Sequence, residues 1–154
     1  MTILYIIQGF LGAGKTTYSK GLVQKTGAVR LNGDEWCDAH FPEEKLSKEW
    51  DTCFAEAIKT LWAEAEQLLA NGKSVILDFG FWSRESRDYA RAKANDLGVA
   101  CELHYVFAPD EVLLERIGKR SGGIAESNVK NFTATKLYFE EPAADEQAIL
   151  IKNY

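Results

Sequence analysis

The chain has 154 residues, of which 46% are hydrophobic and 27% are charged. These proportions are close to globular averages and exclude a disordered chain, a collagen-like repeat and a coiled-coil rod, and the length predicts a single domain over residues 1–154. Eighteen basic and twenty-three acidic residues give a net charge of −5, which disfavours tight non-specific binding to nucleic acid.

The three cysteines, Cys37, Cys53 and Cys101, lie far apart and form no Cys-x-x-Cys pair. This pattern favours neither a disulfide framework nor a zinc site, and it fits a reducing compartment. The apolar run at 3–7 is too short for a signal peptide or a membrane span. We therefore expect a cytoplasmic protein with no membrane partner.

Strand-like and helix-like patterns alternate along the chain. The continuous apolar run at 3–8 indicates a strand buried on both faces, and the helical periodicity of 49–70 ends at Asn71-Gly72. In chain order, we predict strands at 3–8, 28–32, 73–80, 100–108 and 148–153, and helices at 15–25, 49–70, 84–97, 110–120 and 127–140. This alternation predicts an α/β fold with a parallel sheet.

Residues 9–17, GFLGAGKTT, lie between the first predicted strand and the first predicted helix. They match the phosphate-binding pattern G-x-x-x-x-G-K-[ST], a P-loop. Glycines let backbone N–H groups wrap a phosphate chain closely, and the N-terminus of the helix adds a partial positive charge. We expect ATP to be bound by Gly9, Leu11, Gly12, Ala13, Gly14, Lys15, Thr16 and Thr17.

The same region predicts a magnesium site. The Lys15 ammonium can reach the β- and γ-phosphates, and the Thr16 hydroxyl can ligate Mg²⁺, which prefers oxygen ligands. Asp78 follows a buried strand and would bind a magnesium-bound water or Thr16. The alternative for Asp78 is a turn aspartate before Gly80.

Asp34 directly follows the second predicted strand, at the sheet edge where the first strand leads into the P-loop. A carboxylate there can accept the proton of an attacking hydroxyl, so we assign Asp34 as the catalytic base and as an acceptor-binding residue. The alternative is a helix N-cap or an Asx turn after Gly33.

Two groups of residues predict an acceptor pocket. Arg84 and Arg87 open a helix, where basic side chains oppose the macrodipole, so substrate binding would explain them. Ion pairs with Glu85 or Asp88 would explain them equally well. The aromatic residues that could line a pocket for a ring-bearing substrate, or fill the core instead, are Trp36, Phe41, Trp50, Phe79, Phe81 and Trp82.

Arg116 and Arg120 precede the break Ser121-Gly122-Gly123. This pattern suits a hinged lid over 116–130 that places guanidinium groups on the transferring phosphoryl group. The alternative is ordinary basic residues at a helix C-terminus.

The P-loop, LNGDEW, VILDFGFWSRESR and ERIGKR occur in this order. With them the chain resembles the small AAA-33-like P-loop kinases, related to zeta toxins, chloramphenicol phosphotransferase and polynucleotide 5′-kinases. The resemblance implies a P-loop NTPase three-layer α/β/α sandwich, a five-stranded parallel sheet in the order 2-3-1-4-5 and a small helical lid. It also implies that Lys15 and Thr16 bind ATP and Mg²⁺, that Asp34 activates the acceptor, and that Arg116 and Arg120 are lid arginines, with Arg120 also binding ATP.

Arg84 matches a substrate-side arginine of that group less closely, and residues 136–142, KLYFEEP, resemble its chain endings. For this last segment we expect only docking of the lid to the sheet. The predicted activity is transfer of the γ-phosphate of ATP to a hydroxyl of a small metabolite, antibiotic or nucleotide-sugar-like compound. The alternatives are a polynucleotide 5′-hydroxyl kinase, disfavoured by the absence of a long basic stripe, and an ATP-binding regulatory NTPase with slow hydrolysis.

Overall fold

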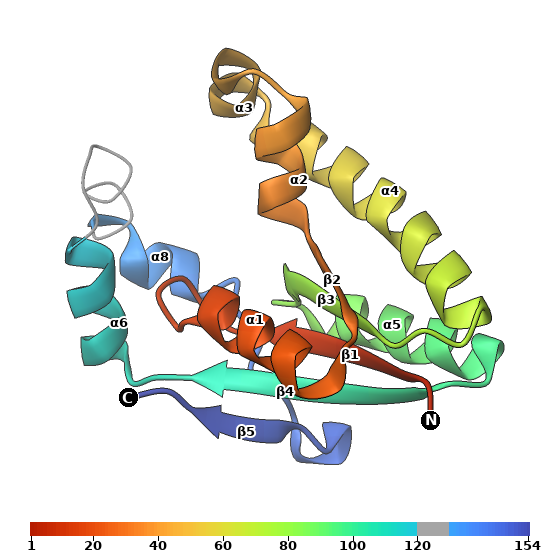
Figure 1. Ribbon diagram of the computed structural model, residues 1–154. Coiled ribbons are helices and arrows are strands. Elements are labelled where there is room, and N and C mark those ends of the chain that lie inside the picture. The colour runs from red at the N-terminus through yellow and green to blue at the C-terminus, as the bar shows by residue number, and fades with distance from the viewer. Residues whose placement is uncertain (120–129) are drawn as a thin grey trace.

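The computed structural model describes residues 1–119 and 130–154 (Figure 1). A five-stranded sheet in the order β2-β3-β1-β4-β5 forms its centre, and each neighbouring pair of strands is parallel. The strands are β1 (Ile3–Gln8), β2 (Val29–Asn32), β3 (Val75–Gly80), β4 (Ala100–Phe107) and β5 (Ile149–Lys152). The predicted parallel sheet and the order 2-3-1-4-5 are confirmed.

Helices cover both faces of the sheet. Those in the described residues are α1 (Lys15–Thr26), α2 (Gly33–His40), α3 (Glu43–Lys48), α4 (Trp50–Ala70), α5 (Arg84–Leu97), α6 (Asp110–Gly118) and α8 (Phe132–Lys136), with a 3-10 helix η1 at Ala144–Glu146. Within the described ranges, no helix combines the length and the apolar character that crossing a membrane requires.

The central strand β1 shows why the chain forms three layers. Leu4 and Ile6 point to one face, where they pack with apolar residues of α4 and α5. Tyr5 and Ile7 point to the other face, where they pack with residues of α1, α6 and α8. Because successive side chains of a strand alternate between faces, a strand covered on both sides is apolar throughout. The apolar run at 3–8 has this cause, and the predicted α/β/α sandwich is confirmed.

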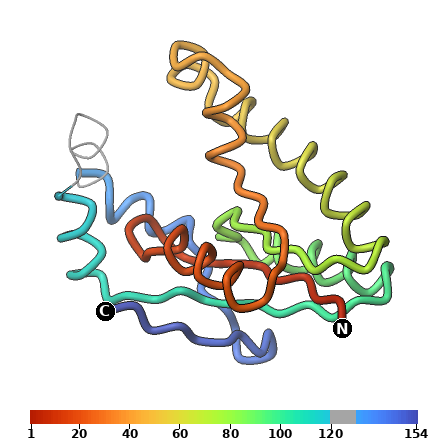
Figure 2. The backbone as a smooth tube through the Cα atoms, viewed as in Figure 1, coloured from red at the N-terminus to blue at the C-terminus, as the bar shows by residue number. Residues whose placement is uncertain are grey.

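Residues 33–48, for which no helix was predicted, form α2 and α3. Helix α2 begins directly after β2, and the Asn32 side chain caps it by accepting a hydrogen bond from the Glu35 N–H at 2.9 Å. Figure 2 shows residues 33–70 leaving the sheet after β2, turning at α3 and returning along α4 to β3. This excursion forms one side of the site described below.

The predicted helix over 127–140 is wrong in its second half. Helix α8 ends at Lys136, and Phe139 is buried in the core. The Glu140 N–H donates to the Trp82 carbonyl at 2.8 Å, a bond that holds the chain against the turn after β3 instead of in a helix. Arg120 and most of the predicted lid at 116–130 lie outside the described residues.

Candidate functional site

The P-loop joins β1 to α1 in the predicted place. Gly12 and Gly14 have φ values of +82° and +93°, a region that side-chain-bearing residues rarely adopt. Gly14 precedes Lys15, the first residue of α1, and among the described residues no side chain caps this helix. Since its first turn also holds no acidic residue, the N–H groups at this end of α1 are suited to an anion.

Two side chains hold the P-loop from behind. Arg116 donates to the carbonyls of Gly12 and Ala13 at 3.2 and 3.4 Å, and Asn153 Nδ2 donates to the Ala13 carbonyl at 2.7 Å. In a trans peptide the N–H points opposite to the C=O, so the bond to the Ala13 carbonyl directs the Gly14 N–H into the loop. Both side chains therefore position the phosphate-binding backbone.

The contacts of Arg116 lie on the P-loop backbone and not in the cleft. Its guanidinium also donates to the Asn153 carbonyl at 2.5 Å and does not line the cleft beside the P-loop. In this arrangement Arg116 positions the loop, and its role as a lid arginine stays a prediction. Arg120, predicted with it as catalytic and ATP-binding, lies outside the described residues.

Sheet register brings the ends of β1, β2 and β3 together. Asn32 of β2 is the partner of Asp78 in β3, and Gln8 of β1 is the partner of Gly80. The P-loop, the start of α2 and the turn after β3 therefore meet at one edge of the sheet, as expected for parallel strands at a switch point.

Asp78 is buried at this edge and fixed by two bonds. Its Oδ2 accepts from the Ser19 hydroxyl at 2.7 Å and from Arg30 Nη2 at 2.9 Å. Ser19 lies on α1, three residues after Thr16, and Arg30 lies on β2. Both bonds supply this buried carboxylate with a hydrogen-bond donor, and these donors offset the cost of its burial. The sequence interpretation missed Ser19 and Arg30, although position 19 falls on the sheet-facing side of α1.

Asp34 lies in the first turn of α2, and its side chain is exposed to the cleft. The alternative role as an N-cap is wrong, because Asn32 caps the helix. Gly33 explains the fixed position of this turn: a Cβ there would lie 2.7 Å from Phe54 of α4, so only glycine permits this packing.

The electrostatic setting of Asp34 is unusual. Partial removal of water by the surrounding protein raises the pKa of its carboxyl above the ordinary value. The nearby Lys15 ammonium lowers that pKa in part, while the Asp78 carboxylate raises it again. Lys15 and Asp34 also line the same cleft. Lys15 Nζ also donates to the Phe10 carbonyl at 3.2 Å.

A cleft of about 1630 Å³ connects these groups. The P-loop residues Lys15, Thr16 and Thr17 line one end of it, together with Asp34 and Asp78. Residues of α4, of the turn after β3 and of the start of α5 line the rest. Thr16 and Asp78, the predicted metal-binding residues, thus share one cavity, and their hydroxyl and carboxylate oxygens suit Mg²⁺.

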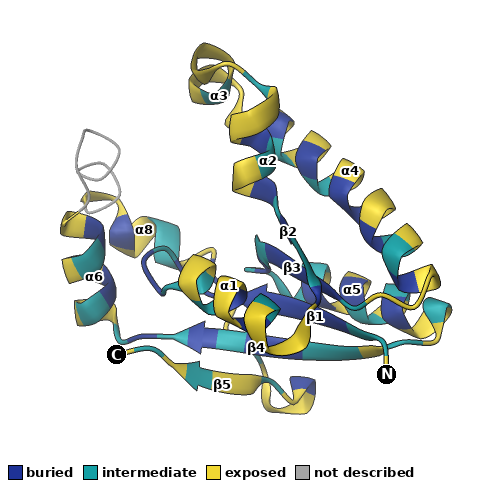
Figure 3. Cartoon of the chain, viewed as in Figure 1, coloured by how far each residue is buried: buried dark blue, intermediate teal, exposed yellow. Residues whose placement is uncertain are grey.

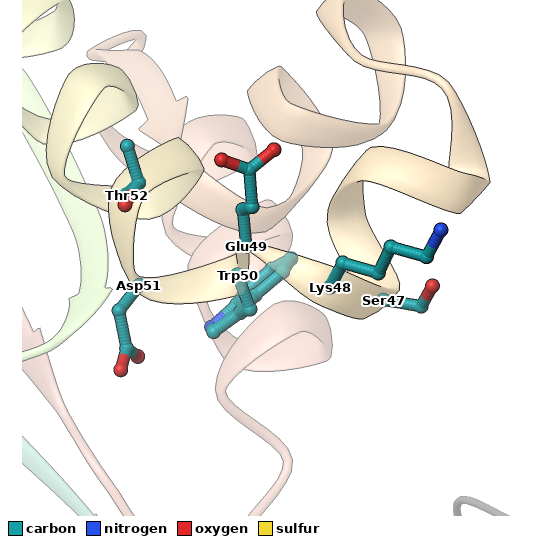
Figure 4. Close-up of a pocket in the computed structure, with 6 residues that line it drawn as sticks. All are labelled: Ser47, Lys48, Glu49, Trp50, Asp51 and Thr52. Carbon is teal, nitrogen blue, oxygen red and sulfur yellow. The ribbon is translucent and has the colours of Figure 1, made fainter.

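The described residues contain no cluster of three His, Cys, Asp or Glu side chains that could hold a metal by themselves. A magnesium ion bound by one hydroxyl, phosphate oxygens and water needs no such cluster. A second hollow, of about 380 Å³, lies at the junction of α3 and α4 (Figure 4). Six consecutive residues, 47–52, line it, and the side chains of Lys48, Glu49 and Asp51 point in different directions. It offers no convergent set of polar groups.

Three predicted substrate-binding residues, Trp36, Arg84 and Arg87, do not line the cleft. The ring of Trp36 stacks on that of His40, with 3.9 Å between centroids. Arg84 forms a two-pronged ion pair with Asp145 at 2.9 and 2.6 Å. This geometry gives no support to a substrate-binding role for these two side chains.

Arg87 is fully buried, and its guanidinium has internal partners. Nε and Nη2 donate to Glu146 at 2.7 and 3.0 Å, and Nη1 donates to the carbonyls of Phe81 and Glu140. The expectation that Arg87 binds substrate is corrected, because all these bonds lie in the protein interior. Arg87 instead fixes the turn after β3 to the C-terminal part of the chain.

Residues 139–146, which begin within the KLYFEEP segment at 136–142, form a strap that we call the C-terminal strap. The Glu140 carbonyl accepts from Gln8 Nε2 at 2.9 Å and from Arg87 Nη1 at 3.1 Å. The strap thereby holds Phe81, which has an uncommon φ of +45°, and Trp82, whose indole N–H donates to the Gly9 carbonyl at 3.1 Å. The expectation that residues 136–142 dock the lid to the sheet stays a prediction, because most of the lid lies outside the described residues. The connection of this segment to the cleft was not expected.

Comparison with known proteins agrees with this geometry. The model of the family described as "AAA domain" matches residues 4–142. A sugar kinase from Janibacter sp. HTCC2649 has a TM-score of 0.70 at 21% identity, over 99% of this chain and 86% of that one. A gluconokinase from Sinorhizobium meliloti 1021 has a TM-score of 0.66 at 19% identity, over 96% of this chain and 81% of that one.

Kti12 from Chaetomium thermophilum, in complex with ADP-AlF3, has a TM-score of 0.66 at 20% identity, over 97% of this chain and 88% of that one. No curated protein matches the chain. These likenesses show a P-loop kinase fold, which in general serves nucleotide and Mg²⁺ binding.

Proposed function

We propose that this chain, which belongs to the AAA domain family through residues 4–142, is an ATP-dependent kinase that phosphorylates a hydroxyl of a small molecule. One observation carries the proposal: Lys15, Asp34 and Asp78 line the same cleft, which continues past them along α4. The cleft therefore provides a phosphate-binding end, a carboxylate for the acceptor and further volume beside both.

The donor end would bind the triphosphate of ATP. The backbone N–H groups of the loop and the N-terminus of α1 surround the phosphates, and Lys15 adds a full positive charge. Thr16 and Asp78 would hold Mg²⁺, directly or through its water; the ion neutralises charge on the phosphate oxygens. Both described bonds of Asp78 end on Oδ2, so Oδ1 is left for a metal-bound water.

Asp34 would act on the acceptor. Its carboxylate accepts the proton of the acceptor hydroxyl, whose oxygen forms a bond to the γ-phosphorus of ATP. The bond between that phosphorus and the β–γ bridging oxygen breaks, and ADP leaves with the electron pair. The raised pKa of Asp34 makes this carboxylate a stronger base than an ordinary aspartate.

The test combines ATP binding with transfer of labelled γ-phosphate to a library of hydroxyl compounds and oligonucleotides. Lys15→Ala should abolish nucleotide-dependent turnover, because it removes the charge on the β- and γ-phosphates. Asp34→Asn should remove transfer to the acceptor while ATP binding stays close to wild type. Asp38→Asn, one turn later on the exposed side of α2, is the matched control and should behave as the wild type.

Full transfer activity in Asp34→Asn would refute the assignment of the base. If purified wild-type protein binds no ATP in the presence of Mg²⁺, the whole proposal fails. Hydrolysis of ATP without any phosphorylated acceptor, unchanged by Asp34→Asn, would indicate a regulatory NTPase instead.

A further inference from the structure

Helix α4 carries two apolar stripes, and the core covers the second only in part: Trp62 is buried, Phe54 and Ile58 are half-buried, and Trp50 is exposed. Its fully core-facing stripe recurs every four residues at Cys53, Ala57, Leu61, Ala65 and Leu69, all buried. A second stripe lies beside it and lines the cleft, at positions 50, 54, 58 and 62. Figure 3 shows the buried residues of α4 interrupted by partly exposed ones along its length. A helix face that is apolar next to an open cleft indicates a surface for an apolar ligand.

The second stripe continues into a connected aromatic surface. Trp62 of α4 contacts Tyr89 of α5 with ring centroids 5.3 Å apart, and it faces Phe79 of β3 at 6.4 Å. Phe79 stacks on Phe81 at 5.6 Å. We call this surface the aromatic wall; it consists of Trp50, Phe54, Trp62, Phe79, Phe81, Trp82 and Tyr89, all of which line the cleft.

Two arrangements keep the aromatic wall in place. Trp50 stacks on Phe54 at 5.6 Å at the outer end of α4. At the inner end, the C-terminal strap and Arg87 hold the turn that carries Phe81 and Trp82. The wall is thus preformed, which lowers the cost of ordering side chains when a ring binds.

The charge along the wall argues against an anionic acceptor. Among the described residues that line the cleft, the cations are Lys15 and Lys59. In the proposed function Lys15 binds the phosphates of ATP and is not available to the acceptor. Asp34, Asp78, Glu66 and Glu85 are the anions. Arginine can bind a phosphate or carboxylate through two parallel hydrogen bonds. No arginine is among the described residues that line the cleft.

The size of the cleft fits two ligands. Its volume of about 1630 Å³ exceeds the roughly 300–1,000 Å³ typical of a site for one small molecule. The P-loop end takes the phosphates of the donor, and the part along α4 remains for an acceptor. Because Asp34 lines the same cleft as Lys15 and the residues of α4, a ring packed on the wall can present a hydroxyl to that carboxylate.

We infer that the acceptor is an uncharged alcohol that carries a planar aromatic ring, and that this ring packs against the aromatic wall with its hydroxyl toward Asp34. This inference rests on the proposed function and specifies its acceptor. The reaction converts R–OH and ATP to R–O–PO₃²⁻, ADP and a proton.

The test measures binding by calorimetry to protein loaded with Mg²⁺ and a non-hydrolysable ATP analogue. The probes are 2-(1-naphthyl)ethanol as the neutral aryl alcohol, glucose as the neutral polar compound and gluconate as the anion. We expect the aryl alcohol to bind at least tenfold more tightly than glucose and gluconate. Trp50→Ala, at a side chain 39% exposed, should weaken that binding about tenfold, since it removes one wall ring.

Tyr138→Ala is the matched control, because Tyr138 is an exposed aromatic side chain that does not line the cleft. It should bind the aryl alcohol as the wild type does, and both variants should bind the ATP analogue normally. Phe54→Leu is a second wall variant that keeps an apolar side chain beside α2 and should also weaken aryl alcohol binding.

Tighter binding of gluconate that is lost in Lys59→Ala would overturn the inference in favour of an anionic acceptor. Equal affinities for the probes, or no binding of any of them to protein that binds the ATP analogue, would also overturn it while the donor site stands. Failure to bind the ATP analogue at all is a different result, which removes the proposed function itself.

Discussion

The buried ion pair between Arg87 and Glu146 gives the sharpest test of the C-terminal strap. Both side chains are 0% exposed. Arg87 Nε lies 2.7 Å from Glu146 Oε1, and Arg87 Nη2 lies 3.0 Å from Glu146 Oε2. The Arg87 hydrogen bonds lower the pKa of Glu146 from 4.5 to about 2, against the opposing effect of burial. A difference of this size corresponds to about 3 kcal/mol of folding free energy at neutral pH.

Glu146→Gln keeps the size of the side chain and removes its charge, so Arg87 stays buried without its counter-ion. Breaking a buried pair in this way costs about 3–5 kcal/mol, in the same range as the value from the pKa. The free energy of unfolding of a native protein is about 5–15 kcal/mol, so the variant should still fold but with much lower stability. The turn of Phe81 and Trp82 should loosen with it.

The assay is urea unfolding followed by circular dichroism at pH 7. For a loss of about 3 kcal/mol and a slope of about 1–3 kcal/mol per molar urea, the midpoint of Glu146→Gln should fall by about 1–3 M. Asp145→Asn is the matched control one position earlier. Its partner Arg84 and Asp145 itself are largely exposed, so its midpoint should stay near wild type.

The pH dependence has a definite sign. Glu146 has a lowered pKa in the folded protein, so its contribution is complete above its unfolded value of 4.5 and disappears as the pH falls toward about 2. The stability gap between wild type and Glu146→Gln should therefore shrink to less than half by about pH 3. Equal midpoints at pH 7, or a gap that stays constant down to pH 3, would refute the reasoning.

Two further predictions concern the P-loop and the base. In Gly14→Ala, a Cβ would lie only 2.1 Å from Asn153 Nδ2 at a φ of +93°, so ATP affinity should fall at least about tenfold by calorimetry. Gly21→Ala, a site with open space on the same helix, should bind ATP normally and melt at a higher temperature; equal ATP affinity in both variants would contradict this. Because the pKa of Asp34 is raised, the acid limb of a kcat/KM–pH profile, which reports the free enzyme, should lie above the ordinary aspartate value of 3.8, and a limb at or below 3.8 would exclude Asp34 as the base.

Local patterns predicted those parts of the fold that local physics determines. The strand at 3–8 is apolar on both faces because both faces are covered, and helix 84–97 begins at a capping serine and ends before a left-handed glycine. The P-loop pattern occupies only nine consecutive residues, although Arg116 and Asn153 hold its backbone from elsewhere in the chain. Each of these features is present in a short segment, so a single sequence reveals it.

Helix α2 was missed although its start carries a signal. Asn32 is followed three positions later by Glu35, a pattern typical of a capped helix N-terminus. Gly33 argued against a helix at this position, since glycine is a poor helix former and commonly marks a turn. Glycine is needed there because Phe54 packs against its Cα, a contact that only the folded chain reveals.

The arginines show where sequence reasoning reaches its limit. Arg87 and Glu146 are 59 positions apart, and Arg84 and Asp145 are 61 apart. Nothing in FWSRESR distinguishes a guanidinium that will be buried from one that will face a ligand. The deciding partners, Asp145 and Glu146, lie between the predicted helix at 127–140 and the predicted strand at 148–153, where no element was predicted, so neither half of each pair pointed to the other.

If the proposed function holds, different parts of this chain determine donor and acceptor specificity. The donor end depends on the P-loop and on Asp78, which Ser19 and Arg30 fix from α1 and β2. Three of the seven wall residues, Trp50, Phe54 and Trp62, lie on α4, in the excursion between β2 and β3, and α4 makes no hydrogen bond to the P-loop backbone among the described contacts. Substitutions along α4 can therefore change the acceptor while the phosphate cradle is preserved. For this reason a motif of nine residues indicates the donor, whereas the acceptor is indicated only by the aromatic wall that folding assembles.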